Sequence, residues 1–296
     1  MSSLYETSQG EAAETDTDGT GVNGADHNTP DEALLHRLMH REPDSVPRVG
    51  QAAQREQARP TVTVVIPALN EEPNLPLVLP RIGRAADEVI LVDGHSGDRT
   101  LEVARQIRPD IRLLMQQGQG KGDALRTGFE AARGDIIVML DADGSTDPRE
   151  IALFVGALIA GAEFVKGTRF AQGAGTADMS LFRRIGHWGL VFLVRVLFGG
   201  RCRDLCYGYM AFWKRILPRL EPDADGFEIE TQIALRALRS GLRVAEIPSF
   251  EQKRFYGKSN LRTIPDGWRV LKTILRERVR RPRRRVKTDP AQDPIS

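Results

Sequence analysis

Short apolar runs alternate with segments of helical period along most of the chain. The runs at 62–66, 88–92, 111–115, 136–140, 163–166 and 242–247 are rich in Val, Ile and Leu and predict strands. Strands that read as continuous apolar runs are covered on both faces, as in a parallel sheet flanked by helices. The sequence therefore predicts an α/β fold with a mostly parallel central sheet.

Helical periodicity fills three of the gaps between these strands. One helix is predicted behind an N-cap at Asp98 or Thr100, a second over 123–133 and a third over 228–240. Their inward faces carry Leu101, Ala104 and Ile107 in the first helix, Ala124, Leu125, Gly128 and Ala132 in the second, and Ile229, Ile233 and Ala237 in the third. Gly134 and Gly241 follow the last two helices as stop signals.

Two carboxylates, Asp141 and Asp143, come directly after the apolar run 136–140. They have the same parity on that strand, so their side chains leave it on one side, separated by the small Ala142. Adjacent carboxylates repel unless a cation lies between them, and hard oxygen donors suit Mg²⁺ or Mn²⁺. A polar turn is the alternative, because Asp, Gly, Ser and Pro all favour turns.

Polar residues also follow the first two strands. Pro67, Asn70 and Glu71 come after the first, and Asp93, Gly94 and Ser96 come after the second. In an open parallel sheet the ligand site lies at the carboxyl ends of the strands. Three polar clusters at equivalent strand ends therefore predict a nucleotide-type site.

Charge is distributed unevenly, although the formal net charge is only +2 over 296 residues. Residues 1–32 hold acids and no Lys or Arg, which is typical of a disordered acidic tail, here assigned to 1–59. A run of arginines extends from Arg276 to Lys287. A solvated tail, an anionic membrane surface and nucleic acid are the alternatives for this run. Because it has neither interleaved aromatics nor a reading helix, nucleic acid is not expected as a partner.

Cysteine content and hydropathy restrict the compartment. Cys202 and Cys206 cannot form a disulfide framework, and no secretory signal is recognisable. The most apolar stretch, 189–198, is interrupted by Arg195 and falls short of the roughly 20 residues that span a bilayer. We therefore expect a cytoplasmic protein, soluble or peripheral on the inner face of the membrane.

Two segments combine apolar and basic residues at helical spacing, one over 181–198 and one over 268–279. In the first, Phe182, Ile185, Trp188 and Phe192 form a stripe that would normally be core. A helix at the membrane interface is the alternative. The two alternatives are compatible if one face of the helix packs in the core and another contacts the membrane. The flanking basic residues are Arg183, Arg184, Arg195, Arg201 and Arg203.

Four motifs resemble family 2 glycosyltransferases with the GT-A fold, and they follow one another in the same order. They are VVIPALNEE at 64–72, VDGHSGDRT at 92–100, GKGDALRTG at 120–128 and LDADGSTDP at 140–148. DLCYGYMAFWKR at 204–215, GFEIET at 226–231 and RFYGKSNL at 254–261 resemble the dolichyl- or polyprenyl-phosphate mannosyltransferase branch without a transmembrane domain. The resemblance covers about 60–276. It implies a catalytic domain at 60–264, followed by an amphipathic basic helix and tail at 265–296.

The resemblance also implies which residues bind the donor. Those expected at the nucleotide sugar are Pro67, Leu69, Asn70, Glu71, Asp93, Gly94, Ser96, Lys121, Gly122, Asp141, Ala142, Asp143 and Lys258. Asp141 and Asp143 match the metal-binding acids, and Ser145 stands where the branch has Gln as the third ligand. Gly94 replaces a commoner Asp, and His95 is expected beside the base as a loop residue.

The basic residues implied by the resemblance divide between donor and acceptor. Arg254 and Lys258 match a late basic loop that closes over the phosphates, and a solvated loop is the alternative. Arg169, Arg183 and Arg184 are expected at an acceptor phosphate, with Arg169 and Arg254 in catalytic roles.

The leading hypothesis is a metal-dependent, inverting transfer of a hexose from a nucleotide sugar of the GDP-mannose or UDP-glucose type to a polyprenyl phosphate. A second hypothesis has a hydroxyl acceptor, such as a glycan or phosphoglycerate, with Glu228 or Glu230 as the general base. A third hypothesis, from another class, is a nucleic-acid-binding protein that uses its basic tail.

Overall fold

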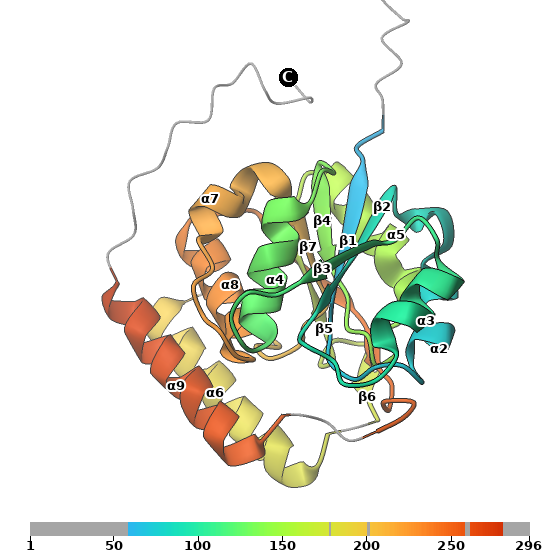
Figure 1. Ribbon diagram of the computed structural model, residues 1–296. Coiled ribbons are helices and arrows are strands. Elements are labelled where there is room, and N and C mark those ends of the chain that lie inside the picture. The colour runs from blue at the N-terminus through green and yellow to red at the C-terminus, as the bar shows by residue number, and fades with distance from the viewer. Residues whose placement is uncertain (1–58, 178, 200–201, 258–260, 281–296) are drawn as a thin grey trace, which may run out of the picture. The chain divides into compact units, whose positions relative to one another are not determined.

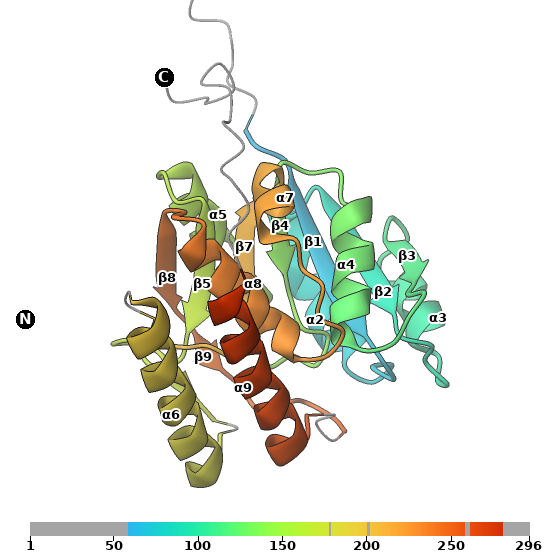
Figure 2. The same cartoon turned by 90° about the vertical axis from the view of Figure 1, so that its left-hand side faces the viewer.

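The computed structural model describes residues 59–177, 179–199, 202–257 and 261–280. The expected acidic tail, apart from its last residue, and the arginine run beyond Arg280 lie outside these residues, as does Lys258. Figures 1 and 2 show the arrangement of the helices and strands in two views.

A seven-stranded sheet forms the centre of the fold, in the order β3-β2-β1-β4-β7-β5-β8. The strands are β1 (Val62–Ala68), β2 (Glu88–Asp93), β3 (Arg112–Met115), β4 (Ile136–Met139), β5 (Phe164–Thr168), β7 (Met210–Trp213) and β8 (Val244–Pro248). All are parallel except β7, which is antiparallel to both β4 and β5. The predicted α/β fold with a mostly parallel sheet is confirmed, with β7 as the strand that the sequence pattern did not indicate.

The register of the sheet brings the carboxyl ends of its parallel strands to one edge. Ala68 at the end of β1 pairs with Asp93 at the end of β2, and Asp93 pairs in turn with Met115 of β3. On the other side of β1, Val65 pairs with Met139, the last residue of β4. The loops that leave these strands therefore start side by side.

Helices cover both faces of the sheet (Figure 1). One face carries α4 (Lys121–Ala131), α7 (Leu217–Leu220) and α8 (Glu228–Arg239); the other carries α2 (Leu75–Ile82), α3 (Thr100–Ile107) and α5 (Ile151–Ile159). A further layer, α6 (Leu181–Phe198) and α9 (Thr263–Val279), packs against α8. Short 3₁₀ turns at Gly83–Ala85, Pro148–Glu150 and Lys214–Ile216, and a two-stranded parallel sheet of β6 (Gly175–Thr176) and β9 (Phe250–Glu251), complete the described elements.

The three predicted helices are present. The N-cap of α3 is Arg99 and has no side-chain cap, so neither of the two expected N-cap residues takes that position. Asp98, just before it, accepts a hydrogen bond from the Thr100 backbone nitrogen at 3.0 Å. Helix α4 begins at Lys121, two residues before the predicted start, and Asp123 in its first turn accepts from the Gly118 nitrogen at 2.7 Å.

The main core lies between the sheet and its two helical layers. Phe129 of α4 meets Phe212 of β7 edge to face, with ring centroids 5.4 Å apart. Full burial of such a side chain stabilises the fold by about 1.5–3 kcal/mol. A second, smaller core joins the α6–α9 layer to α8 through Val191, Val194, Leu235, Val270 and Ile274. Among the described residues, no helix is long and apolar enough to cross a membrane.

Candidate functional site

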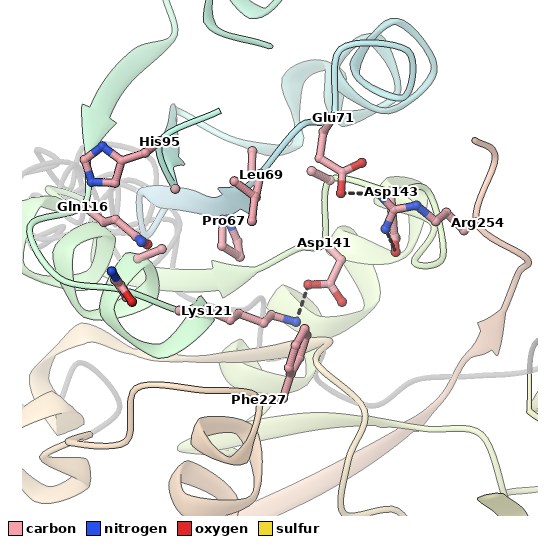
Figure 3. A pocket seen from close by; sticks show the side chains of 16 residues that line it. Pro67, Leu69, Glu71, His95, Gln116, Lys121, Asp141, Asp143, Phe227 and Arg254 are labelled. Carbon is pink, nitrogen blue, oxygen red and sulfur yellow. Dashed lines mark hydrogen bonds and ion pairs between the residues drawn. The ribbon is translucent and has the colours of Figure 1, made fainter. Parts of the chain in front are cut away.

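A cavity of about 460 Å³ lies at the carboxyl ends of β1, β2 and β4 (Figure 3). Its lining residues come from the end of β1, from the loops after β1, β2, β3 and β4, from the start of α4, from the residue before α8 and from the loop after β9. They are Pro67, Ala68, Leu69, Glu71, Gly94, His95, Gln116, Gln119, Gly120, Lys121, Ala124, Asp141, Ala142, Asp143, Phe227 and Arg254. The site lies where the strand-end argument predicts it.

Hydrogen bonds join the loops after β1 and β2 to each other. Asn70, with φ of 56°, accepts from the Gly97 nitrogen at 2.8 Å, and its own nitrogen donates to Ser96 Oγ at 2.9 Å. Asn70 and Ser96 do not line the cavity. Their contacts hold the two loops that do.

Asp93 is a buried carboxylate with one oxygen available. It is 1% exposed, and its Oδ2 accepts from the Ser96 nitrogen at 2.9 Å. Its Oδ1 has no hydrogen-bond partner among the described residues. Asp93 itself does not line the cavity, although Gly94, the next residue, does. Buried acceptors in folded proteins are nearly always paired, so a ligand group or a water is the partner to expect for Oδ1.

Lys121 connects Asp141 to Glu230. Its Nζ lies 2.6 Å from Asp141 Oδ1 and 2.6 Å from Glu230 Oε1 (Figure 3 shows the Asp141 contact). Although burial opposes the charged form, the two carboxylates raise the pKa of Lys121 above its ordinary value. Burial also raises the pKa of Glu230, which is 5% exposed. The ammonium group of Lys121 is therefore shared by two carboxylates, Asp141 and Glu230, at the cavity wall.

A second cation, Arg254, connects Asp143 to Glu71 (Figure 3). Its Nη1 lies 3.2 Å from Asp143 Oδ2, and its Nη2 contacts Glu71 Oε1. Burial raises the pKa of Glu71, an effect that Asn74 and Arg254 oppose. Asn74 Nδ2 donates to the other Glu71 oxygen at 2.6 Å.

Backbone hydrogen bonds attach the Arg254 loop to the acidic loop after β4. The Gln252 nitrogen donates to the Ser145 oxygen at 2.9 Å, and the Phe255 nitrogen donates to the Asp143 oxygen at 3.2 Å. The φ of Gly144 is +79°, and a methyl group there would lie 2.1 Å from the Phe255 ring. Glycine at this position thus permits the close approach of the two loops.

The donor set fits a divalent cation that takes its remaining ligands from a substrate. Asp141 and Asp143 face the same cavity, and their side chains are 25% and 22% exposed. Each carboxylate is paired with a cationic side chain, Asp141 with Lys121 and Asp143 with Arg254. No cluster of three or more His, Cys, Asp or Glu ligands occurs among the described residues. Phosphate oxygens or water would complete the shell of Mg²⁺ or Mn²⁺. Ser145 does not line the cavity; its nitrogen donates to Asp143 Oδ1 at 2.9 Å.

Two glycines have neighbours that the sequence did not indicate. Gly122 does not line the cavity: its nitrogen donates to the Asp225 oxygen at 2.7 Å, and a methyl group there would overlap Ala224. The absence of a side chain at Gly122 therefore allows close contact with the backbone of residues 224–225, whereas we expected close contact with the ligand. Gly208 stands behind the Lys121 cluster, where a methyl group would lie 2.5 Å from Glu230 Oε1. The sequence feature that could have pointed to Gly208 is its position between two Tyr in the motif at 204–215.

Arg169, which we expected at an acceptor phosphate, lies outside the cavity. Arg169 is 6% exposed and does not line the cavity. Its Nε and Nη2 donate to the two oxygens of Asp204 at 2.7 and 2.8 Å, and its Nη1 donates to Glu251 at 3.0 Å. Although burial raises the pKa of Asp204, Arg169 dominates and lowers it to about 2. Two carboxylates thus already use the donors that a phosphate would need.

Arg183 and Arg184 lie in the first turn of α6, outside the cavity lining. In contrast, several lining residues were not in the predicted site. Gln116 and Gln119 follow β3, so the same strand-end argument extended to the third strand would have found them. Phe227, just before α8, places its ring centroid 5.7 Å from Lys121 Nζ. His95 lines the cavity, as expected of a loop residue there.

Comparisons with known proteins agree with this geometry. The family model described as Glycosyl transferase family 2 matches residues 63–221. The polyprenol monophosphomannose synthase of Mycolicibacterium smegmatis is 30% identical over 69% of this chain and 82% of its own length. The dolichol-phosphate mannosyltransferase of Pyrococcus furiosus is 28% identical over 68% of this chain, and the match spans only 59% of that relative.

Solved structures with the same fold include the glucosyl-3-phosphoglycerate synthase of Mycobacterium tuberculosis in complex with Mn²⁺, UDP and glucosyl-3-phosphoglycerate. That chain is 25% identical, with a TM-score of 0.60, and the match covers 75% of this chain and 81% of that one. The predicted GT-A arrangement is thereby confirmed.

Proposed function

The chain belongs to glycosyl transferase family 2 and is a glycosyltransferase, and we propose that it transfers a hexose from a nucleotide sugar to a polyprenyl phosphate. The proposed donor is of the GDP-mannose or UDP-glucose type, with Mg²⁺ or Mn²⁺ as cofactor. The proposed location is the cytoplasmic, anionic face of a membrane, where the acceptor lipid lies. Donor and acceptor chemistry can be argued separately from the residues of the cavity.

One observation carries the donor assignment: two carboxylates, each paired with a cationic side chain, line one cavity. Lys121 and Arg254 lie against Asp141 and Asp143 at 2.6 and 3.2 Å. Such an arrangement suits a diphosphate, whose oxygens need cations, and a divalent ion, which needs carboxylates. Asp93 lies just behind the cavity lining at the neighbouring strand end, and we assign its unpaired Oδ1 to a donor group on the base or ribose.

Asp141 and Asp143 would hold the divalent ion, and a bound ion supplies Lewis-acid neutralisation of the departing diphosphate. Arg254 lies on the loop after β9, close enough to donate to phosphate oxygens once a diphosphate competes for it. The acceptor oxygen attacks the anomeric carbon from the side opposite the diphosphate, so a single displacement inverts the configuration. The loops that carry Asp143 and Arg254, the charged residues proposed to face the leaving diphosphate, are joined by backbone hydrogen bonds.

The state of Glu230 supports a phosphate acceptor. A hydroxyl must lose a proton as it attacks, whereas a phosphate is already anionic near neutral pH. Glu230 holds Lys121 at 2.6 Å and is 5% exposed, so its carboxylate serves a cation instead of facing open cavity. The name of the Mycolicibacterium smegmatis relative, a polyprenol monophosphomannose synthase, points to the same acceptor class.

A second candidate function is transfer to a hydroxyl compound such as a phosphoglycerate. It is favoured by the match to the glucosyl-3-phosphoglycerate synthase at a TM-score of 0.60. In that case Glu228 or Glu230 would act as the base. Glu228 lies in the first turn of α8, and its Oε2 is buried without a hydrogen-bond partner among the described residues.

The test is a direct comparison of acceptors. Purified full-length protein is incubated with Mn²⁺, a panel of GDP- and UDP-hexoses and either a short polyprenyl phosphate or 3-phosphoglycerate. We expect a lipid-linked hexose with one donor, identified by solvent extraction and mass spectrometry. Product on phosphoglycerate, with none on the lipid from any donor, would replace the first candidate by the second.

A further inference from the structure

Exposed apolar side chains are concentrated on two adjacent helices. Of sixteen large apolar side chains that the described residues expose, six lie on α6 and four on α9. They are Leu181, Phe182, Ile185, Trp188, Phe192 and Val196 on α6, and Ile264, Trp268, Leu275 and Val279 on α9, here called the α6–α9 apolar face. The two helices lie side by side in both views (Figures 1 and 2).

Helix α6 is apolar on two sides, and only one is covered. Val191 and Val194 are buried in the small core shared with α8 and α9, and His187 is buried beside Phe170, with ring centroids 5.0 Å apart. Phe182 and Trp188, which would normally be core, are 68% and 64% exposed. The reading of this stripe as core is therefore wrong, because other residues of α6 take the inward positions. Large aromatic side chains left outside a fold mark a contact surface.

Exposed charges on the two helices have one sign. Those on α6 are Arg184 and Arg195, and those on α9 are Arg269, Lys272, Arg276 and Arg278. The two acids of α9, Asp266 and Glu277, are buried, and Glu277 lies 2.6 Å from Arg236. After α9 the sequence continues with Arg281, Arg283, Arg284, Arg285 and Lys287. A basic rim around an apolar face complements an anionic surface.

We propose that the α6–α9 apolar face docks onto an anionic lipid bilayer, an inference that deepens the proposed transfer to a polyprenyl phosphate and rests on it. Trp and Phe side chains enter the boundary between headgroups and acyl chains, while Arg and Lys extend to lipid phosphates. A second copy of the chain is a poorer occupant. Two such faces placed together would bring their basic side chains against each other.

The docking face adjoins the cavity. Phe227, which lines the cavity, is followed by α8, and α8 packs on α9. A methyl group on the preceding Gly226 would lie 3.3 Å from Arg269 Nη1, so α9 reaches the loop that forms the cavity wall. Both helices extend past the edge of the sheet where β1 and β4 end (Figure 1). Docking would therefore bring the cavity to headgroup level, where an acceptor phosphate lies.

Flotation of the full-length protein with lipid vesicles tests the proposal. We expect co-flotation with vesicles of equal parts phosphatidylglycerol and phosphatidylcholine, and little with phosphatidylcholine alone. The combined variant Phe182→Ser, Trp188→Ser and Phe192→Ser should lower partitioning at least about tenfold, since each change removes an apolar insertion. Leu153→Ser with Ile159→Ser is the matched control, because these side chains on α5 are also exposed, by 57% and 49%. Thermal melting checks that both variants fold.

Sugar transfer to a short polyprenyl phosphate in detergent separates the two proposals. The α6 variant should keep this activity while it loses vesicle binding. Equal binding by the α6 variant and the wild type, or no binding by the wild type, would overturn the docking proposal. Loss of self-association in that variant, without vesicle binding by the wild type, would instead assign the face to a second copy. Vesicle binding without any lipid-linked product would leave docking standing and remove the proposed acceptor.

Discussion

Arg254 contacts Asp143 at the wall of the cavity, with its Nη1 3.2 Å from the Oδ2 of that carboxylate. The carboxylate that would bind a divalent ion thus has a counter-ion supplied by the chain itself. The same is true of Asp141, whose partner is Lys121 at 2.6 Å. If metal and diphosphate bind as proposed, the partners would exchange: the carboxylates would bind the ion, and the side-chain cations would bind the phosphates.

Replacing Arg254 by Gln should change metal affinity and turnover in opposite directions. Without its competitor, Asp143 should bind Mn²⁺ about tenfold more tightly in the absence of nucleotide, equivalent to about 1.4 kcal/mol. Turnover should fall by about 10²-fold or more, because a donor to the leaving diphosphate is lost. The paramagnetic resonance signal of free Mn²⁺ reports the first effect and product formation the second.

Arg81→Gln is the control for that experiment, since its guanidinium lies 5.2 Å from the Phe255 ring in the same region but does not line the cavity. It should leave Mn²⁺ affinity unchanged. Weaker Mn²⁺ binding by Arg254→Gln would contradict competition at Asp143.

Replacing Glu230 by Gln distinguishes a positioning residue from a general base. If Glu230 only holds Lys121, turnover should fall by about tenfold and the pH profile should keep its shape. A base should cost about 10²–10⁴-fold and remove the acidic limb of the profile. The measurement is turnover across pH together with nucleotide binding by calorimetry. Near-complete loss with intact donor binding would favour the hydroxyl acceptor.

Gly208→Ala should displace the contacts of Lys121 with Asp141 and Glu230, because the new methyl group points at these side chains. The added methyl group would lie 2.5 Å from Glu230 Oε1 and 3.1 Å from both Asp141 Oδ2 and Lys121 Nζ. We expect a loss of about 1–3 kcal/mol in the free energy of unfolding and a clear fall in turnover. Gly186→Ala in α6, which has no neighbour within 4 Å, should stabilise instead by about 0.5–1 kcal/mol. Urea unfolding of both variants decides, and a neutral Gly208→Ala would refute the close packing.

Arg169→Met should act on stability. The change leaves Asp204, fully buried, without its bidentate partner, at a cost of about 3–5 kcal/mol. Arg99→Gln removes an exposed pair with Glu72 and should alter stability by less than about 1 kcal/mol. Equilibrium unfolding compares the two. If Arg169→Met unfolded like the wild type but lost acceptor affinity, the acceptor role first expected for Arg169 would return.

His187 should make stability depend on pH. Burial lowers the pKa of His187 to about 4 from an ordinary value of 6.5, so the folded protein binds its proton less readily than the unfolded chain. The free energy of unfolding is therefore unaffected by this titration above pH 6.5. It decreases as the pH falls towards 4, by up to about 3 kcal/mol. Unfolding free energies of the wild type and His187→Gln should therefore differ in slope over this interval. Parallel curves would rule out the titration of His187 as the cause.

The sequence predicted the sheet well where strands obey a simple rule. Apolar runs covered on both faces identified β1, β2 and β4, and their polar exits identified Glu71 and Asp143. The rule works because parallel strands end at one edge, whatever the rest of the chain does. The strand order and the register followed from contacts that the one-dimensional pattern does not contain.

Residues that depend on distant partners were not predictable from the sequence pattern. Arg169 was assigned to a phosphate by the resemblance to the mannosyltransferase branch, but its partners Asp204 and Glu251 lie 35 and 82 positions away. Strand β7 was not predicted, and its antiparallel pairing with β4 and β5 depends on contacts with segments far away in the sequence. The stripe on α6 was ambiguous because a helix with two apolar sides fits core and surface equally well.

The direction of β7 has a consequence for where the chain tolerates change. Because β7 runs against its neighbours, it delivers its entrance to the cavity edge, and Gly208 arrives there before the strand begins. Its exit lies at the opposite rim, where the Lys214 nitrogen donates to the Asp135 oxygen at 2.7 Å. A label or short insertion after Trp213 would thus sit remote from the chemistry, whereas the same insertion before Met210 would rebuild the floor of the site.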